Sequence, residues 1–273
     1  MNITAADVAK LRKMTGAGMM DCKNALIEAN GDFERAQEII REKGKLIASK
    51  RADHTATEGV VVSKVVDGKK GYLLCLACET DFVAKNEAFA ASANEILDIA
   101  LANDCADLDA LMATVAGGKT VAEIATEKSG QTGEKVEIPY YARIEAPMCV
   151  TYIHMNSKLG TLIGFNKEVP AEVAKDVAMQ AAAMAPVSIS EADCPADVLE
   201  KERQIGREQA RLEGKLEAML DKIADGKLKK YLSENTLLNQ ALVKNNKITV
   251  AQFIKDAVAD ATVVAYKRFS LND

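Results

Sequence analysis

Apolar residues recur every three or four positions in the first part of the chain, in three separate runs. Turn-forming residues separate the runs at 15–18 and at Asn30-Gly31, and Gly44 follows the third run. A spacing of three to four places apolar side chains on one face of a helix. Glycine favours the left-handed position just beyond a helix end. The pattern therefore predicts a small three-helix domain over residues 1–45, with the third helix ending at Gly44.

Beyond this domain the pattern changes from helix to strand. Residues 59–66 are rich in β-branched side chains, Asp67-Gly68 marks a turn, and residues 71–78 are almost entirely apolar. Two such runs joined by a short turn predict a β-hairpin. The intervening segment 46–58 is charged and polar, which predicts a solvated tether. Its basic residues leave open a contact with an acidic partner surface.

A strand-then-helix order occurs twice in the rest of the chain. Strand patterns return after the first hairpin and its helices, and helical spacing resumes after Pro170. Repetition of this order predicts an α+β core made of two halves with antiparallel sheets. We place the first half at residues 59–135 and the second at residues 136–190 and 231–273.

The segment 191–230 interrupts the second half. It carries many charges of both signs beside a narrow apolar seam, and Gly214 divides it. A helix with so narrow an apolar face buries little of its surface. We predict an inserted helical hairpin that protrudes from the core, and mixed charges argue against a nucleic-acid contact there.

Composition narrows the possible classes of protein. The 273 residues carry a net charge of -5, whereas a nucleic-acid-binding domain is usually basic. No apolar run approaches the ~18 residues that a membrane span requires. Six scattered cysteines are typical of a reducing compartment. We expect a cytoplasmic protein that binds neither nucleic acid nor membrane directly.

Residues for catalysis are scarce. The chain has two histidines, and the motifs of metalloproteases, serine hydrolases and phosphate-binding loops are missing. Cys75 and Cys78 have the spacing of a redox pair, which raises the alternative of a thiol enzyme. However, they lie in a predicted strand, where residues three apart point to opposite faces. We expect structural cysteines, no metal, no cofactor and no active site.

The loop predicted between the second strand and the next helix contains an apolar side chain among polar ones. Phe82 stands between Asp81 and Val83, with Lys85 nearby. The pattern leaves two interpretations open. Phe82 either folds back into the core or projects into a pocket of a partner, with Asp81 and Lys85 as a polar rim.

Two stretches resemble the signatures of the bacterial translation elongation factor Ts family. They are LRKMTGAGMMDCKNAL at residues 11–26 and ETDFVAKN at residues 79–86. Weaker similarity extends to residues 152–154, 159–163 and 226–231. Because both long motifs occur in the right order and spacing, the resemblance is specific and covers the whole chain.

The resemblance implies a fold and a function. The three-helix domain is expected to be similar to a ubiquitin-associated domain. The family acts as a guanine-nucleotide exchange factor for elongation factor Tu, which implies that role here, in a heterodimer or a dimer of heterodimers. Such a factor acts on GDP and Mg²⁺ bound to the partner and needs no cofactor of its own. A bare interaction module without exchange activity is the alternative.

The resemblance also implies the residues that touch the partner. Asp81 and Phe82 are expected to wedge between two helices of the GTPase domain near its magnesium site. Thr80 and Val83 flank this pair in the same motif.

Other expected contacts lie outside this motif. Arg12, Met19 and Met20 belong to the first signature and are expected to touch another part of the same domain. His154 lies in the second core half, on a stretch that can contact a distal β domain of the partner.

Overall fold

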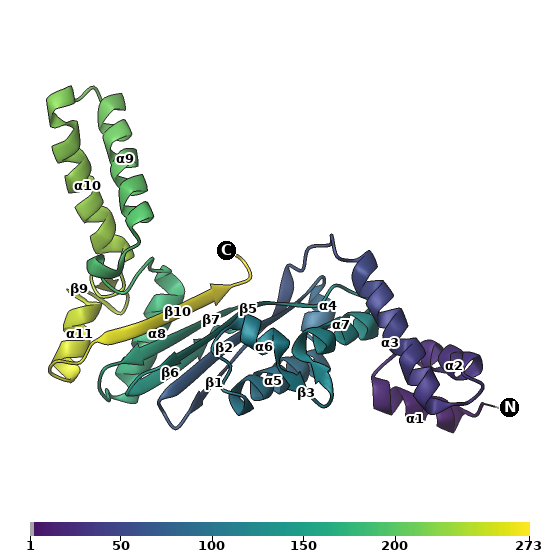
Figure 1. The fold of residues 1–273 in the computed structure, drawn as a ribbon. Helices are drawn as coiled ribbons and strands as arrows, with labels where there is room; N and C mark the ends of the chain where they lie inside the picture. The colour runs from purple at the N-terminus through teal and green to yellow at the C-terminus, as the bar shows by residue number, and fades with distance from the viewer. Residues whose placement is uncertain (1–2) are drawn as a thin grey trace.

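The computed structural model describes residues 3–273 as a three-helix unit, an α+β core and a projecting helical hairpin (Figure 1). Met1 and Asn2, where the predicted first domain begins, lie outside the described residues. The predicted α+β class with antiparallel sheets is confirmed. The domain boundaries and the likeness to a ubiquitin-associated domain stay predictions.

The elements follow one another as the sequence pattern suggested, with some short additions. The helices are α1 (Ala5–Thr15), α2 (Met19–Glu28), α3 (Phe33–Lys50), α4 (Asp81–Ala84), α5 (Glu87–Ala102), α6 (Leu108–Ala113), α7 (Val121–Thr132), α8 (Ala171–Met184), α9 (Ala196–Leu212), α10 (Leu220–Asn235) and α11 (Val250–Ala257). The strands are β1 (Glu58–Val66), β2 (Lys70–Cys78), β3 (Val115–Ala116), β4 (Lys119–Thr120), β5 (Glu137–Glu145), β6 (Met148–Ile153), β7 (Leu159–Phe165), β8 (Ala241–Leu242), β9 (Asn245–Thr249) and β10 (Val263–Ser270).

Helices α1 to α3 enclose a small apolar core of their own. Leu11, Cys22 and Leu26 are fully buried there. Thr4 and Asp7 form a reciprocal capping box at the start of α1, which satisfies backbone N–H groups that have no partner within the helix. Gly16 ends α1 in the left-handed conformation. The predicted three-helix unit is therefore present.

The prediction that the third helix ends at Gly44 is wrong. Helix α3 continues to Lys50, into the segment predicted as a tether. Gly44 is buried where α3 meets α7, and a Cβ atom added to Gly130 of α7 would lie 2.5 Å from the Gly44 Cα. Here glycine permits two helix backbones to meet and does not end the helix. The spacing of apolar residues in the sequence does not distinguish these two roles of glycine.

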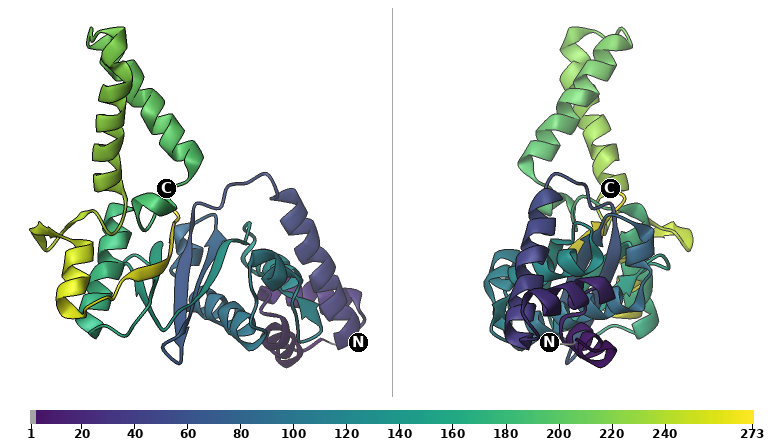
Figure 2. Two further views of the ribbon diagram at one scale, coloured as in Figure 1. Left: turned by 60° about the vertical axis from the view of Figure 1, so that its left-hand side comes forward. Right: turned by 90° about the vertical axis from the view of Figure 1, so that its right-hand side faces the viewer.

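The core has four layers. One sheet has the strand order β1-β2-β5 and the other β10-β7-β6, and both are antiparallel throughout. The sheets pack face to face over one apolar cluster. Helices α5, α6 and α7 cover the outer face of the first sheet, and α8 and α11 cover the second (Figures 1 and 2).

Glycines on β7 bring the two sheets together. Thr161, Ile163 and Phe165 point toward the layer of α8, so the alternating positions Gly160 and Gly164 face the other sheet. A Cβ atom on Gly160 would lie 2.8 Å from Val61 Cγ1 and 2.8 Å from Leu73 Cδ1, and one on Gly164 would lie 3.3 Å from Ile144 Cδ1, all on the first sheet. Side chains of the first sheet therefore pack directly on the β7 backbone, in space that a side chain on β7 would occupy.

The predicted helical hairpin is present as α9 and α10, and it projects away from the core (Figure 1). Its helices approach closely at Gly206, where an added Cβ would lie 3.3 Å from the Ala224 Cα. Ion pairs join Arg203 to Asp225 at 2.9 Å and Arg207 to Asp221 at 3.1 Å. Among residues 3–273, none of the helices has the length and apolarity needed to cross a membrane.

The tight packing around Gly164 yields a prediction about stability, because an added Cβ would lie 2.8 Å from the Ala146 Cβ of the β5–β6 connection and 3.1 Å from the Ala265 Cβ of β10. Gly164→Ala should destabilise the protein by about 1–3 kcal/mol, because alanine Cβ atoms on both neighbours cannot rotate away from the added methyl. Gly226→Ala adds the same methyl inside α10, where nothing lies within 4 Å, and should stabilise by up to ~1 kcal/mol through helix propensity. Urea unfolding measures both changes. Equal stability of Gly164→Ala and wild type would contradict this tight packing around Gly164.

Candidate functional site

The segment predicted as the loop around Phe82 is a single helical turn, α4, between β2 and α5 (Figure 1). Ala84 is buried and Val83 packs against the first core cluster. Phe82 lies on the opposite side of the turn, and its side chain is 85% exposed. The interpretation that Phe82 folds back into the core is therefore wrong, and its contact with a partner stays a prediction.

Asp81 and Lys85 lie beside Phe82. The Lys85 ammonium donates a 2.6 Å hydrogen bond to the Asp81 carboxylate, one helical turn apart. This hydrogen bond and the positive charge of Lys85 hold the pKa of Asp81 below its ordinary value. An exposed pair of this kind contributes little to stability. Both charges are therefore available to a partner at the edge of the phenyl ring.

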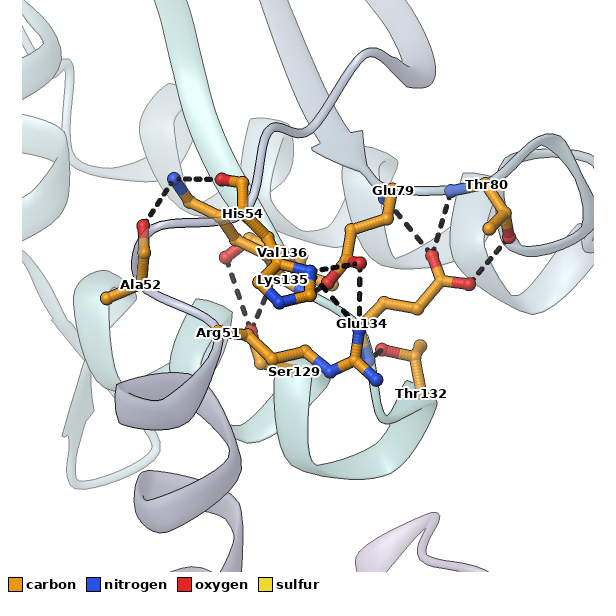
Figure 3. Close-up of polar contacts among 10 residues, drawn as sticks. All are labelled: Arg51, Ala52, His54, Glu79, Thr80, Ser129, Thr132, Glu134, Lys135 and Val136. Carbon is orange, nitrogen blue, oxygen red and sulfur yellow. Dashed lines mark hydrogen bonds and ion pairs between the residues drawn. The ribbon is translucent and has the colours of Figure 1, made fainter.

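The start of α4 is clamped by the carboxylate of Glu134, which follows α7. This carboxylate accepts the backbone N–H groups of Glu79 at 3.1 Å and Thr80 at 3.0 Å, and the Thr80 hydroxyl at 2.6 Å (Figure 3). Hydrogen bonds to a charged acceptor are stronger than neutral ones. Thr80 is thus a positioning residue for the turn, with its side chain turned toward Glu134.

Glu79 forms the second carboxylate of this polar cluster. It accepts the Lys135 backbone N–H at 2.5 Å and the Arg51 guanidinium at 2.8 Å, and His54 Nδ1 lies 2.9 Å away (Figure 3). Partial burial raises the pKa of Glu79. The hydrogen bond from Lys135 and the contacts with His54 and Arg51 outweigh that effect, so the pKa lies below its ordinary 4.5.

The segment after α3 is bound to this cluster and is not a free tether. Lys135 Nζ donates to the carbonyls of Ala52 at 3.1 Å and His54 at 3.0 Å. Together with the Arg51–Glu79 pair, these bonds fasten the end of α3 to the base of α4. The predicted solvated tether is wrong for this part of the chain.

A groove of ≈ 850 Å³ separates α4 from the turn between β6 and β7. Met155, on that turn, is 95% exposed and lines the groove, as does Phe82. Lys158 pairs with Glu58 at 2.6 Å, and the Val61 N–H donates to the Ser157 carbonyl at 2.6 Å. These contacts hold the turn on β1, so both walls of the groove are anchored.

The other predicted site residues lie on three separate elements. Met19 and Met20 occupy the first turn of α2 and are 47% and 64% exposed, and Arg12 is exposed on α1. His154 is exposed at the end of β6, next to Met155, with its Nδ1 3.0 Å from the Tyr152 hydroxyl. The structure thus places His154 beside the wall of the groove and the N-terminal residues in the three-helix unit.

Sequence reasoning missed Met155 and Glu134. An apolar residue at the tip of a predicted hairpin is a signal that could have pointed to Met155. Glu134 has no such signal, because it meets Thr80 only through the fold.

The thiol-enzyme alternative does not fit the structure. Cys75 lies between the sheets and Cys78 lies in the first core cluster, so they point to opposite faces as expected. Burial raises the pKa of both thiols, that of Cys78 to about 12. A thiolate nucleophile needs the opposite shift. Within residues 3–273, no group of side chains has the makeup of a metal site.

Comparisons with known proteins identify close similarity over the whole chain. The family model described as Elongation factor TS matches residues 79–273. Elongation factor Ts of Porphyromonas gingivalis is 46% identical over 273 residues, which is 100% of this chain and 99% of that protein. Elongation factor Ts of Christiangramia forsetii is 46% identical, and that of Flavobacterium psychrophilum is 42% identical, each over 98% of both chains.

The polar cluster predicts a pH-dependent stability. Glu79→Gln should lower the free energy of unfolding at pH 7, because Arg51 and the Lys135 N–H lose a charged acceptor. The folded-state pKa of Glu79 is depressed, so its stabilisation is complete above pH 4.5 and is lost as the pH falls through the folded value. The difference from wild type should therefore shrink between pH 7 and pH 3 in denaturant titrations. A difference that does not change with pH would show that the charge is unimportant.

Proposed function

The chain belongs to the elongation factor Ts family and so takes part in translation elongation, and from this premise we propose that it is the guanine-nucleotide exchange factor of elongation factor Tu. The proposal assigns it no reaction of its own. GDP and Mg²⁺ belong to the partner, and the chain changes how tightly the partner holds them. The assembly is a heterodimer or a dimer of heterodimers.

The observation that supports this most is the exposed Phe82 on an anchored turn. Burying a phenylalanine side chain contributes about 1.5–3 kcal/mol. Phe82 is exposed in the free chain, so this contribution is available to binding. Glu134 already orders the backbone that carries it. Binding therefore loses little conformational entropy, which is the advantage of a preorganised anchor. These features suit a wedge that enters a pocket between two helices of the partner.

Exchange follows from linked binding equilibria. A factor that binds the nucleotide-free partner more tightly than the GDP-bound one must weaken GDP binding by the same free energy. The Mg²⁺ ion and the diphosphate are the largest charges in the partner's site. Phe82 displaces the helices around that site, and Asp81 brings a carboxylate close to it. Together they make the nucleotide-bound geometry less favourable.

The N-terminal residues supply a second contact in this proposal. Met19 and Met20 present exposed thioether side chains, which adapt to irregular surfaces, and Arg12 adds a charge. His154 contributes a third contact, to a distal β domain of the partner. Met155 lies beside it and lines the same groove as Phe82. In this proposal the partner binds at three separate places, namely the N-terminal residues, Phe82 and His154.

The wedge predicts a selective loss of activity. Phe82→Ala should slow the catalysed release of a fluorescent GDP analogue from elongation factor Tu by about 30-fold, equivalent to ~2 kcal/mol of lost anchoring. Stability should change by no more than ~0.5 kcal/mol, since the ring makes few contacts within the chain. Leu212→Ala, which removes a side chain that is 87% exposed on the hairpin, is the matched control. Undiminished release by Phe82→Ala would sink the wedge assignment.

Linkage predicts how nucleotide affects the complex. The chain should bind nucleotide-free elongation factor Tu at least ~100-fold more tightly than the partner saturated with GDP and Mg²⁺. This ratio corresponds to a coupling free energy of about 3 kcal/mol, at the upper end of the typical range. Calorimetric titration with and without GDP measures both affinities. Equal affinities would exclude exchange and favour a bare interaction module.

A further inference from the structure

Helix α3 links the two surfaces that the proposed function assigns to the partner. Its first half packs in the three-helix unit through Ala36. Its second half crosses α7 at Gly44, and the residue after its end, Arg51, pairs with Glu79 at the base of α4 (Figures 1 and 3). An 18-residue helix is about 27 Å long, so α3 spans the distance between the two parts of the molecule.

The crossing of α3 and α7 is a contact between backbones. A Cβ atom on Gly130 would lie 2.5 Å from the Gly44 Cα and 3.5 Å from its carbonyl carbon and nitrogen. No side chain stands between the helices at this point, so none can adjust its rotamer to accept a change in spacing. The separation of the helices is therefore defined by the backbones themselves.

Polar contacts flank this crossing and fix the three-helix unit on α7. Gln131 Nε2 donates to the Thr15 carbonyl at the end of α1 at 2.6 Å. Glu127 is 3.5 Å from Arg41 of α3 and 2.6 Å from Lys119. The unit is thus held at α1 and at α3 by a single core helix.

We propose that Gly130 is a positioning residue for nucleotide exchange. It sets the height of α3 above α7, and through α3 it holds Met19 and Met20 in a constant geometry relative to Phe82. This inference rests on the proposed function, in which both surfaces engage one partner. Two linked contacts raise affinity only when their geometry permits simultaneous engagement. Because α3 rests on α7 through backbone contact at Gly44 and Gly130, that geometry exists before the partner binds.

The test compares two alanine variants that each add one methyl inside a helix. Gly130→Ala forces the Gly44 backbone away, whereas Gly226→Ala in α10 meets nothing within 4 Å. Both variants gain helix propensity, so a difference between them reports the crossing. Spin labels on Glu28→Cys and Lys175→Cys measure the placement of the unit, because both positions are exposed and the native cysteines are buried. Gly130→Ala should shift or broaden the distance distribution.

Exchange kinetics provide the functional readout. Gly130→Ala should raise the concentration of factor needed for half-maximal GDP release by about tenfold, a partial loss of the gain from a second linked contact, while the maximal rate stays near wild type. The wedge at Phe82 is unchanged, which is why the maximal rate is retained. Phe82→Ala should lower the maximal rate instead. Gly226→Ala should match wild type in both quantities.

A double-mutant cycle separates positioning from general damage. If Gly130 acts by placing the N-terminal contact, Gly130→Ala should have little further effect in a Met20→Ala background. Additive effects of the two substitutions on the half-maximal concentration would overturn the inference. A shifted distance between the spin labels with an unchanged half-maximal concentration would overturn it too. If the wild-type chain does not promote GDP release from elongation factor Tu, the proposed function itself fails. The distances between the spin labels still show whether Gly130 sets the position of the three-helix unit. Should Gly130→Ala not fold, Gln131→Ala removes the Thr15 hydrogen bond without a clash and should shift both readouts in the same direction.

Discussion

Two carboxylates that accept backbone N–H groups hold the junction between β2 and α5. Glu134 binds the amides of Glu79 and Thr80, and Glu79 binds the amide of Lys135 and the Arg51 guanidinium. Each carboxylate joins segments that are more than fifty positions apart or lie in different parts of the molecule. These bonds fix the backbone at the start of the one-turn helix that carries the exposed Phe82. The clamp therefore makes Phe82 a defined surface feature.

The four-layer core gives this clamp a rigid base. Glycines permit close packing at two places, where side chains of the first sheet meet the β7 backbone at Gly160 and where the backbones of α3 and α7 meet at Gly130. Close backbone contact leaves few adjustable side chains, so displacement of one layer is felt by the next. The exchange mechanism proposed above requires such stiffness, because the wedge must deform less than the binding site that it enters.

Sequence patterns predicted most of the fold because alternation and helical spacing report which face of an element is buried. The opposite faces of Cys75 and Cys78 follow from strand geometry alone, and the structure agrees. The prediction of a helix end at Gly44 is wrong because glycine occurs both at helix ends and where two helices cross closely. Only the position of α7 distinguishes the two cases. The direction of Phe82 was undecided for a similar reason. It depends on which side of the turn packs against the core, and the structure shows that Val83 and Ala84 take that side.

In the proposed exchange mechanism, position 82 lies against the nucleotide-binding domain of the partner. Photo-crosslinking detects this contact, with Phe82 replaced by p-benzoylphenylalanine in the full chain and elongation factor Tu as the partner. We expect a covalent adduct to the GTPase domain that excess GDP with Mg²⁺ suppresses. A complex that forms normally but yields no adduct from position 82, or an adduct that GDP leaves unchanged, would contradict it.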